Sequence, residues 1–437
     1  MKLNTYTPQG RSEIRQTTSH TGKFAGYLID QPGLCALIFL ISIVPFHQIV
    51  GGYFPYYKEL FTLIFFVLVI DLLFRQKITT SKLELLFLVS FPGLLVLCAL
   101  ADTDNKLYDD SGITYSEGML SVKPVFFMLR CAILHIPMVM YFAIRGVTRS
   151  EINKVARICV CVAPISVLAY LYCAENASLA NMLNGTFVLP YLNYVPYLTF
   201  AAMSGIFLVY SDSNLIMKFL SLFVAGLIML LAIVTTGRQN VLFILISAFS
   251  FIAFSNRRPP LSIIVSSFIF SALMICLAYM FINTDQISRQ LLDRFSSLDG
   301  FFDGPKTTEN MDGAPTRYNL MYDGLMLLNP EQFIFGAGLT SSNGPGPHCD
   351  YIRWIQRVGL FVAVIGFLPF FMCFYRAYQG LNFRRTDPLL IFLLLTLGFT
   401  IFFSIFGFVR EDAYESTFGY LGLAISLGSR RNKISFH

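Results

Sequence analysis

Residues 215–255 read LIMKFLSLFVAGLIMLLAIVTTGRQNVLFILISAFSFIAFS and contain two apolar runs that meet at the short polar stretch 237–240. Each run is long enough to cross the roughly 30 Å hydrocarbon core of a bilayer as a helix. Gly237 allows the chain to reverse tightly between them, because glycine has no Cβ to restrict its backbone. This stretch therefore predicts two membrane-spanning helices joined by almost no loop.

Similar apolar runs recur along the whole chain, which is 55% hydrophobic and only 13% charged and has a mean hydropathy of +0.62. Ordinary soluble domains carry about 25% charged residues. The fold class we expect is an all-α polytopic membrane protein with about twelve transmembrane helices. The predicted spans are residues 33–50, 58–74, 81–100, 125–144, 152–174, 194–211, 215–236, 239–255, 261–282, 354–377, 387–408 and 413–429.

The loops between these spans predict their orientation. An N-terminus in the cytoplasm places most basic loop residues on the cytoplasmic side, namely Lys2, Arg11, Arg15, Lys23, Arg75, Lys77, Arg145, Arg149, Arg257, Arg258, Arg376, Arg384, Arg385, Arg430, Arg431 and Lys433. The other side receives the acidic loop around Asp102 and Asp109 and the long segment 283–353. This positive-inside pattern predicts a multi-pass protein of the bacterial inner membrane with both termini in the cytoplasm.

The predicted organisation is a cytoplasmic tail (1–32), transmembrane helices one to nine (33–282), a large periplasmic loop (283–353), helices ten to twelve (354–429) and a second cytoplasmic tail (430–437). The net charge of +6 does not indicate a nucleic-acid partner, because most of the Lys and Arg residues lie in short loops. The first 30 residues are polar, so we expect no cleaved signal peptide.

The sequence predicts neither a metal nor a nucleotide cofactor. The nine cysteines lie mostly inside predicted spans, and no CxxC pair or metal-ligand spacing occurs. Cys159 and Cys161 are two residues apart and therefore point to different faces of a helix. We interpret them as small apolar residues that fill space in the packing. We find no P-loop, no GxSxG motif and no DxD-like motif in the loops.

Arg238 is a charged residue that the orientation does not require. It lies at the predicted periplasmic ends of the seventh and eighth spans, where the positive-inside rule would not place an arginine. A guanidinium matches phosphate oxygens with paired hydrogen bonds, so Arg238 is a candidate anion clamp. The alternative is an interfacial arginine that extends to lipid headgroups.

The predicted periplasmic loop has about 70 residues, and loops of that length are usually functional. Residues 287–295 and 317–328 predict short helices, the second of them closed by Asn329 and Pro330. Residues 335–347 are rich in glycine and predict a flexible approach to His348. We expect a small cap on the periplasmic face, which either handles substrate or serves as a structural lid.

His348 precedes the tenth predicted span and is a candidate general base, because the pKa of histidine lies near ambient pH. Arg353 and Arg357 follow at intervals of about one helical turn and could share one side of a helix with it. The alternative is a histidine at a helix start that bonds only to the backbone.

Weaker candidates lie elsewhere in the predicted membrane region. Arg130 and His135 share the fourth span and are candidates for facing a polar cavity. Arg410 lies in the last predicted periplasmic turn, where it is a second candidate anion contact, although its neighbours Glu411 and Asp412 could neutralise it.

The order of these motifs resembles the O-antigen polymerase and O-antigen ligase superfamily. The matching pieces are Thr236-Gly237-Arg238, Arg317-Tyr318 through Asn329-Pro330, Gly336-Ala337-Gly338, and His348 followed by Gly359. The resemblance covers residues 235–360 in detail and the twelve-span plan elsewhere. Cys349 stands where the ligase branch usually has Asn, Ser or Gln, and Val362 replaces a small residue, which favours the polymerase branch.

The resemblance implies a metal-independent glycosyltransferase that works at the outer leaflet of the inner membrane. Its donor would be a glycan on undecaprenyl diphosphate. The acceptor would be another lipid-linked repeat unit for a polymerase, or lipid A-core for a ligase. Membrane lipid and a polysaccharide chain-length regulator are the further candidate partners.

The resemblance also implies roles for particular residues. His348 would take the proton of the acceptor hydroxyl, and Arg238 and Arg317 would stabilise the diphosphate leaving group. The further substrate-binding candidates are Arg294, Tyr318, Arg353, Arg357 and Arg410.

Two other classes remain open from the sequence. A flippase for lipid-linked oligosaccharides would also have about twelve spans, but both of its faces must open in turn. Here the surplus charge gathers on one predicted face, and no internal half-repeat is visible. A membrane sensor or scaffold is the third possibility.

Overall fold

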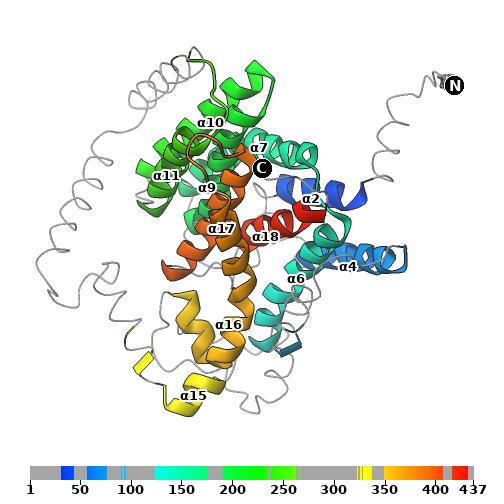
Figure 1. Cartoon of the computed structure of the whole chain (residues 1–437). Coiled ribbons are helices and arrows are strands. Elements are labelled where there is room, and N and C mark those ends of the chain that lie inside the picture. Colours follow the sequence, from blue (N-terminus) through cyan, green and yellow to red (C-terminus); the bar gives the residue numbers. More distant parts are fainter. Residues whose placement is uncertain are drawn as a thin grey trace, which may run out of the picture.

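The computed structural model describes residues 31–43, 57–75, 90, 93–94, 124–175, 190–234, 238–261, 265, 322, 325–326, 328–336, 349–406 and 416–431. Within these ranges the chain is helical and forms no strand, apart from one isolated bridge between Ser255 and Thr386. The helices are α2 (Pro32–Ile43), α4 (Tyr57–Arg75), α6 (Pro124–Arg145), α7 (Arg149–Glu175), α9 (Pro190–Ser211), α10 (Leu215–Val234), α11 (Arg238–Phe254), α15 (Pro330–Phe335), α16 (Asp350–Gln379), α17 (Pro388–Phe406) and α18 (Ser416–Arg431) (Figure 1).

The predicted all-α class is confirmed for the described residues. Ten of the twelve predicted spans coincide with a helix there, while the third (81–100) and the ninth (261–282) lie largely outside the described ranges. Two described helices are long and apolar enough to cross a membrane, with candidate spans at Leu215–Ala232 in α10 and Tyr351–Gln379 in α16. The count of twelve stays a prediction.

Helix α9 lies at the centre of one helical layer and contacts α7, α10, α11 and α17. Its contact with α7 includes a buried hydrogen bond of 2.7 Å from the Tyr197 hydroxyl to the Cys159 carbonyl oxygen. Its contact with α17 includes stacked rings of Phe207 and Phe392, whose centroids lie 4.7 Å apart. Aromatic packing of this kind gives the long apolar helices a defined register.

A second group of helices packs beside the first. Helix α6 contacts both α4 and α18, and α18 in turn contacts α17. His135 of α6 is buried and its ring stacks on Tyr420 of α18, with centroids 4.8 Å apart and planes at 6°. His135 therefore packs against an aromatic ring in the interior, and the polar cavity that the sequence suggested for it stays a prediction.

The outward surfaces of several helices are apolar. Phe74 of α4 is 87% exposed, and Ile216 of α10, Phe249 of α11 and Phe361 of α16 are also exposed. Many large exposed apolar side chains on helices of this kind suit contact with lipid or a partner protein. The two cysteines of α7 differ as their spacing predicts, since Cys159 is buried and Cys161 is exposed.

Four segments that follow or join helices, residues 145–149, 211–214, 253–257 and 380–387, meet at one end of the helices. The Thr386 N–H donates to the Phe254 carbonyl at 2.9 Å, and the Asn256 N–H donates to the Thr386 carbonyl at 2.9 Å. Arg149 pairs with Asp387 at 2.7 Å. We call this region, made of residues 145–149, 211–214, 253–257 and 380–387, the basic end. The opposite end, formed by the start of α11, the end of α17, the first part of α16 and α15, is called the site end.

Candidate functional site

The structure places Arg238 as the first residue of α11. Helix α10 ends at Val234 and α11 begins at Arg238, so three residues separate the two helices, in agreement with the predicted tight reversal. The backbone N–H groups of a helix N-terminus attract anions. A basic residue at this position adds to that attraction, although the side chain of Arg238 itself lies outside the described residues.

The end of α17 contacts the first turns of α11. The ring of Phe243 lies edge-on to Phe399, with centroids 5.0 Å apart, and it is also 6.1 Å from the ring of Phe402. Helices α11 and α17 are antiparallel, because residues 253–256 contact residues 384–386 at the basic end. Arg238, five residues before Phe243, therefore lies level with the last turn of α17.

The first part of α16 contacts the same end of α17 from another side. The Tyr351 hydroxyl donates a hydrogen bond of 2.8 Å to the carbonyl oxygen of Ile401. Cys349, the N-cap residue of α16, is buried. His348 itself lies outside the described residues, and its neighbour Cys349 begins the segment whose Tyr351 contacts Ile401. The two segments that the sequence singled out thus meet the same two turns of one helix.

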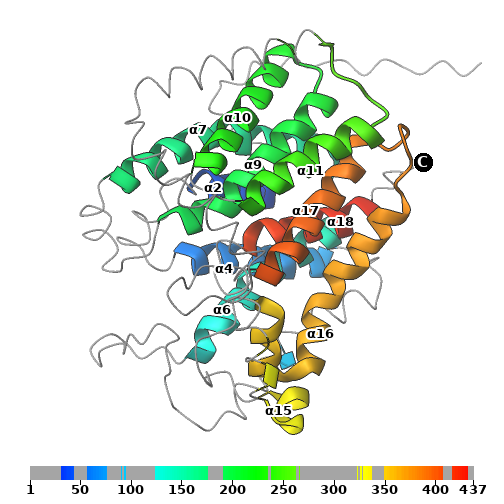
Figure 2. The same cartoon turned by 90° about the vertical axis from the view of Figure 1, so that its left-hand side faces the viewer.

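Helix α16 is not continuous. Gly359 has φ 81° and ψ 163°, which breaks the helix and separates residues 350–358 from the long segment 360–379. The ring of Tyr351 lies 4.3 Å from Phe367 and 6.2 Å from Phe371, so the first segment folds back along the second. We call residues 350–358 the fold-back segment. Figures 1 and 2 show it with α15 in a part of the molecule that extends beyond the end of α17.

The fold-back segment corrects the predicted tenth span. The sequence predicted one span from residue 354, because the run from Ile355 onward is largely apolar. The long segment begins only after Gly359, and its 20 residues reach about 30 Å at 1.5 Å per residue. Arg353 and Arg357 therefore lie on the fold-back segment outside the long helix, one helical turn apart, and both are half-buried.

Helix α15 holds the fold-back segment through two glycines. Both Gly336 (φ 89°) and Gly359 (φ 81°) have backbone conformations that favour glycine. A Cβ on Gly359 would meet the Ile334 carbonyl oxygen and lie 2.6 Å from the Phe335 carbonyl carbon. A Cβ on Gly336 would lie 2.8 Å from the Gly359 nitrogen. The two backbones thus cross in direct contact next to Arg357.

The sequence interpretation missed α15. Asn329 and Pro330 begin this helix: the Asn329 side chain accepts from the Gln332 N–H at 2.8 Å, and the Gln332 side chain accepts from the Asn329 N–H at 3.2 Å. The upstream helix 317–328 that they were expected to close lies largely outside the described residues. Gly336 packs against the backbone of α16, and the rest of the expected flexible approach, residues 337–347, lies outside the described residues. The Asn-Pro-x-Gln spacing of a capping box with proline at the first helical position was the available signal.

Most of the other candidate residues lie outside the described ranges. They are Arg294, Arg317, Tyr318 and Arg410, together with the side chain of Arg130. Their roles stay predictions. Among the described side chains, no group of three or more His, Cys, Asp or Glu residues lies close enough together to hold a metal ion.

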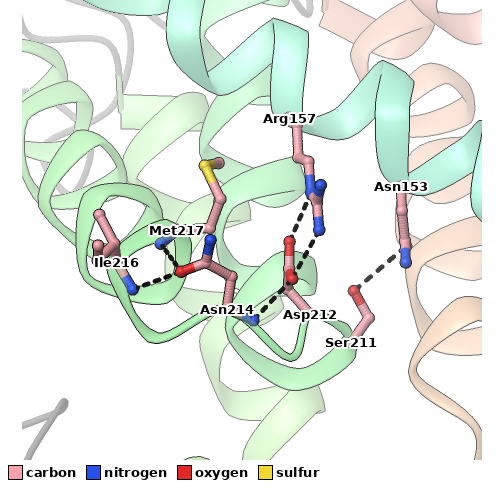
Figure 3. A network of polar contacts seen from close by, with 7 residues as sticks. All are labelled: Asn153, Arg157, Ser211, Asp212, Asn214, Ile216 and Met217. Atoms are coloured by element: carbon pink, nitrogen blue, oxygen red, sulfur yellow. Dashed lines mark hydrogen bonds and ion pairs between the residues drawn. The ribbon is translucent and has the colours of Figure 1, made fainter. Parts of the chain in front are cut away.

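The basic end contains a polar network whose groups bind one another (Figure 3). Arg157 of α7 donates to both carboxylate oxygens of Asp212, at 2.7 and 2.8 Å, and the Asp212 side chain is fully buried. Asn214 caps α10 by accepting from the Ile216 and Met217 N–H groups. The Ser211 hydroxyl donates to Asn153 at 3.4 Å. This network fastens the turn between α9 and α10 to α7.

Two carboxylates near the basic end, those of Asp212 and Glu151, have lowered pKa values. Burial would raise the pKa of Asp212, but hydrogen bonds from Arg157 and from the Asn214 N–H outweigh burial and lower it. Burial acts in the same way on Glu151, and the Thr148 N–H and Arg145 together lower the pKa of its carboxyl. Arg145 contacts Glu151 at 2.6 Å. These carboxylates pair with guanidinium and backbone N–H groups of the same end, so we assign them a structural role.

The chain matches no family model, no curated protein and no solved structure.

Proposed function

We propose that this protein is a membrane glycosyltransferase that polymerises O-antigen repeat units carried on undecaprenyl diphosphate, at the periplasmic face of the bacterial inner membrane. The observation that carries the proposal is the position of two candidate segments at one end of α17. Phe243 connects the segment that begins with Arg238 to that end, and Tyr351 connects the segment that follows His348. These two segments carry two of the four motifs on which the superfamily resemblance rests.

The proposed reaction joins two lipid-linked sugars. The acceptor hydroxyl attacks the anomeric carbon of the donor, the bond from that carbon to the diphosphate oxygen breaks, and undecaprenyl diphosphate leaves with the electron pair. His348 takes the proton of the hydroxyl. Arg238 and Arg317 stabilise the charge that develops on the diphosphate, so fixed guanidinium groups serve where a metal would otherwise be needed.

The fold-back segment supplies further contacts in this proposal. Arg353 and Arg357 are separated by four residues on it and share one helix face. Both residues are half-buried. The fold-back segment that carries them extends, together with α15, beyond the end of α17, where a glycan that leaves the membrane surface would pass (Figure 2). We assign them to binding of the sugar-diphosphate donor or the acceptor, together with Tyr318, Arg294 and Arg410.

The apolar surfaces favour a membrane setting. Exposed aromatic and aliphatic side chains on α4, α10, α11 and α16 suit contact with acyl chains, and a polyprenyl tail needs an apolar groove of the same kind. The connections of the basic end carry Arg145, Arg149, Arg257 and Arg384, which suits the cytoplasmic face under the positive-inside rule. The site end would then face the periplasm.

Complementation tests this function. A strain that lacks its own copy of the gene is supplied with the wild-type protein, and its lipopolysaccharide is resolved by gel. Restoration of a ladder from a background of core plus a single repeat unit supports a polymerase. If the background is bare core with long polymer held on undecaprenyl diphosphate, the protein is the ligase of the same superfamily. Accumulation of lipid-linked units on the cytoplasmic leaflet would indicate a flippase instead.

The variants His348→Ala and Arg317→Ala test the assigned roles beside the wild type. Both should abolish the ladder while the protein level in the membrane stays unchanged on an immunoblot. Arg384→Ala is the matched control, because Arg384 lies at the basic end and its guanidinium stacks on Phe383 at 5.1 Å. A full ladder from both variants would remove these two residues from the mechanism.

A further inference from the structure

The first turn of α11 contains a second polar residue, Asn240. Its side chain is only 5% exposed, and its Oδ1 atom is buried and accepts no hydrogen bond from any described residue. A buried amide oxygen without a donor is unfavourable, and most such groups in proteins have a partner. The structure therefore leaves an acceptor at the site end that requires a donor from elsewhere.

Asn240 belongs to the stripe of α11 that faces the protein interior. Asn240, Ile244, Ser247 and Phe251 recur at helical spacing and are all buried, whereas Leu242 and Phe249 on the other side of the helix are exposed. Phe251 of this stripe stacks on Tyr210 of α9, with centroids 5.2 Å apart. The side chain of Asn240 is thus held inside the bundle and cannot turn outward to lipid headgroups.

The direction of the side chain brings Asn240 toward the proposed anion site. In an α-helix each Cα–Cβ bond tilts toward the N-terminus, so the side chain of the third residue covers the first turn. Arg238 begins that turn, and the backbone N–H groups there are free of intrahelical partners. The amide of Asn240 therefore lies beside the helix N-terminus on its interior side.

The chemistry of the unsatisfied atom selects the ligand. At neutral pH the hydrogen-bonding groups of a diphosphate are all acceptors. It can therefore bind Arg238 and backbone N–H groups, but it cannot donate a hydrogen bond to an amide oxygen. A sugar hydroxyl, or the N–H of an acetamido sugar, can donate. We propose that Asn240 binds the sugar attached directly to the diphosphate and accepts a hydrogen bond from its hydroxyl or N–H group. This inference rests on the proposed function and names a substrate contact within it.

The test compares wild type with Asn240→Leu, which removes the amide while conserving most of its volume. Purified protein is assayed with lipid-linked repeat units extracted from a polymerase-deficient strain, and its affinity for undecaprenyl diphosphate without sugar is measured separately. Loss of one hydrogen bond to the sugar should lower kcat/KM about tenfold. Affinity for the sugar-free lipid should stay within about twofold, because its diphosphate offers no donor to the Asn240 Oδ1.

Thermal stability gives an independent readout. Leucine removes the buried Oδ1 that lacks a donor among the described residues and has a similar size, so the Tm of the variant without substrate should equal or exceed that of wild type. Asn240→Ala serves as the second variant if leucine prevents folding. Ser247→Ala is the matched control on the same stripe, since its hydroxyl already donates to the Phe243 carbonyl oxygen at 2.6 Å, and it should retain full activity.

Two outcomes would overturn the inference. Wild-type kcat/KM in both Asn240 variants would show that the amide makes no contact with substrate. An equal loss of affinity for sugar-free undecaprenyl diphosphate would place the contact on the lipid diphosphate. Failure of the wild-type protein itself to transfer the glycan is a separate result, because it contradicts the proposed function and not the role of Asn240 within it.

Discussion

The two ends of the helices treat their polar residues differently. At the basic end, carboxylates meet guanidinium groups within 2.6 to 2.7 Å in three pairs of described residues. At the site end, Gly336 and Gly359 bring two backbones into direct contact beside Arg357, and the buried Oδ1 of Asn240 has no donor among the described residues. Breaking a buried ion pair leaves an uncompensated charge, so the paired groups have a structural role. The Asn240 Oδ1, which is buried without a donor among the described residues, is available to a ligand.

The largest expected effect separates the arginines of the two ends. Arg238→Ala should lower the rate of glycan transfer about 10²- to 10³-fold, the usual loss when one donor to a developing negative charge is removed. Arg384→Ala, at the basic end, should leave the rate unchanged. The measurement is polymer formed per minute by equal amounts of purified protein. Equal rates for both variants would mean that the site end does not hold the leaving group.

The next prediction concerns the backbone crossing. Gly359→Ala should reduce transfer at least tenfold and lower the free energy of unfolding by about 1–3 kcal/mol, because a Cβ would meet the Ile334 carbonyl oxygen and the positive φ is unfavourable for alanine. Activity falls because α15 can no longer hold the fold-back segment with Arg353 and Arg357. Thermal unfolding in detergent and the transfer assay measure the two effects.

Gly380→Ala is the control for this prediction. Gly380 follows the other end of α16 with a φ of −81°, and a Cβ there would meet the tip of the Leu390 side chain, which can move. We expect its unfolding free energy to stay within about 0.5 kcal/mol of wild type. If Gly359→Ala behaved in the same way, the crossing would not position the site.

The same two glycines show what the sequence could and could not predict. The long helices were predictable, because each of them is a run of apolar residues bounded by polar turns, and such runs are visible in the sequence. The fold-back segment was not, because the apolar run continues through Gly359 and nothing local distinguishes a break there from a helix that tolerates glycine. Its cause is a contact with α15, 23 residues earlier in the chain, and such a contact cannot be read from hydropathy.

The candidate site was predictable in a different way. Arg238 attracted attention because its charge contradicts the orientation pattern, and a single sequence is sufficient to see that. Asn240 gave no such signal, since asparagine after a helix start is common in any protein. Only its burial and its unsatisfied Oδ1 distinguish it, and both are properties of packing against α9.

A smaller effect is expected at the basic end. Asp212→Asn removes the charge that Arg157 contacts and should lower the free energy of unfolding by about 1–2 kcal/mol, because a charged acceptor is replaced by a neutral one in a buried position. The transfer rate of the folded protein should not change. Asp387→Asn is the control: its pair with Arg149 is partly exposed, and asparagine preserves the cap on Leu389, so about 0.5 kcal/mol or less is expected.

The smallest effect is the pH dependence of the same carboxylates. The pKa values of Asp212 and Glu151 are lowered in the folded protein, so below about pH 4 the unfolded chain binds more protons than the folded one. Their contribution is therefore fully present at neutral pH and is lost as the pH falls through the folded pKa values. The Tm of wild type should fall more steeply than that of Asp212→Asn between about pH 5 and pH 3. Parallel curves of Tm against pH for the two proteins would mean that Arg157 does not stabilise the charged form of Asp212. The contrast between the basic end and the site end would then rest on the observations at the site end alone.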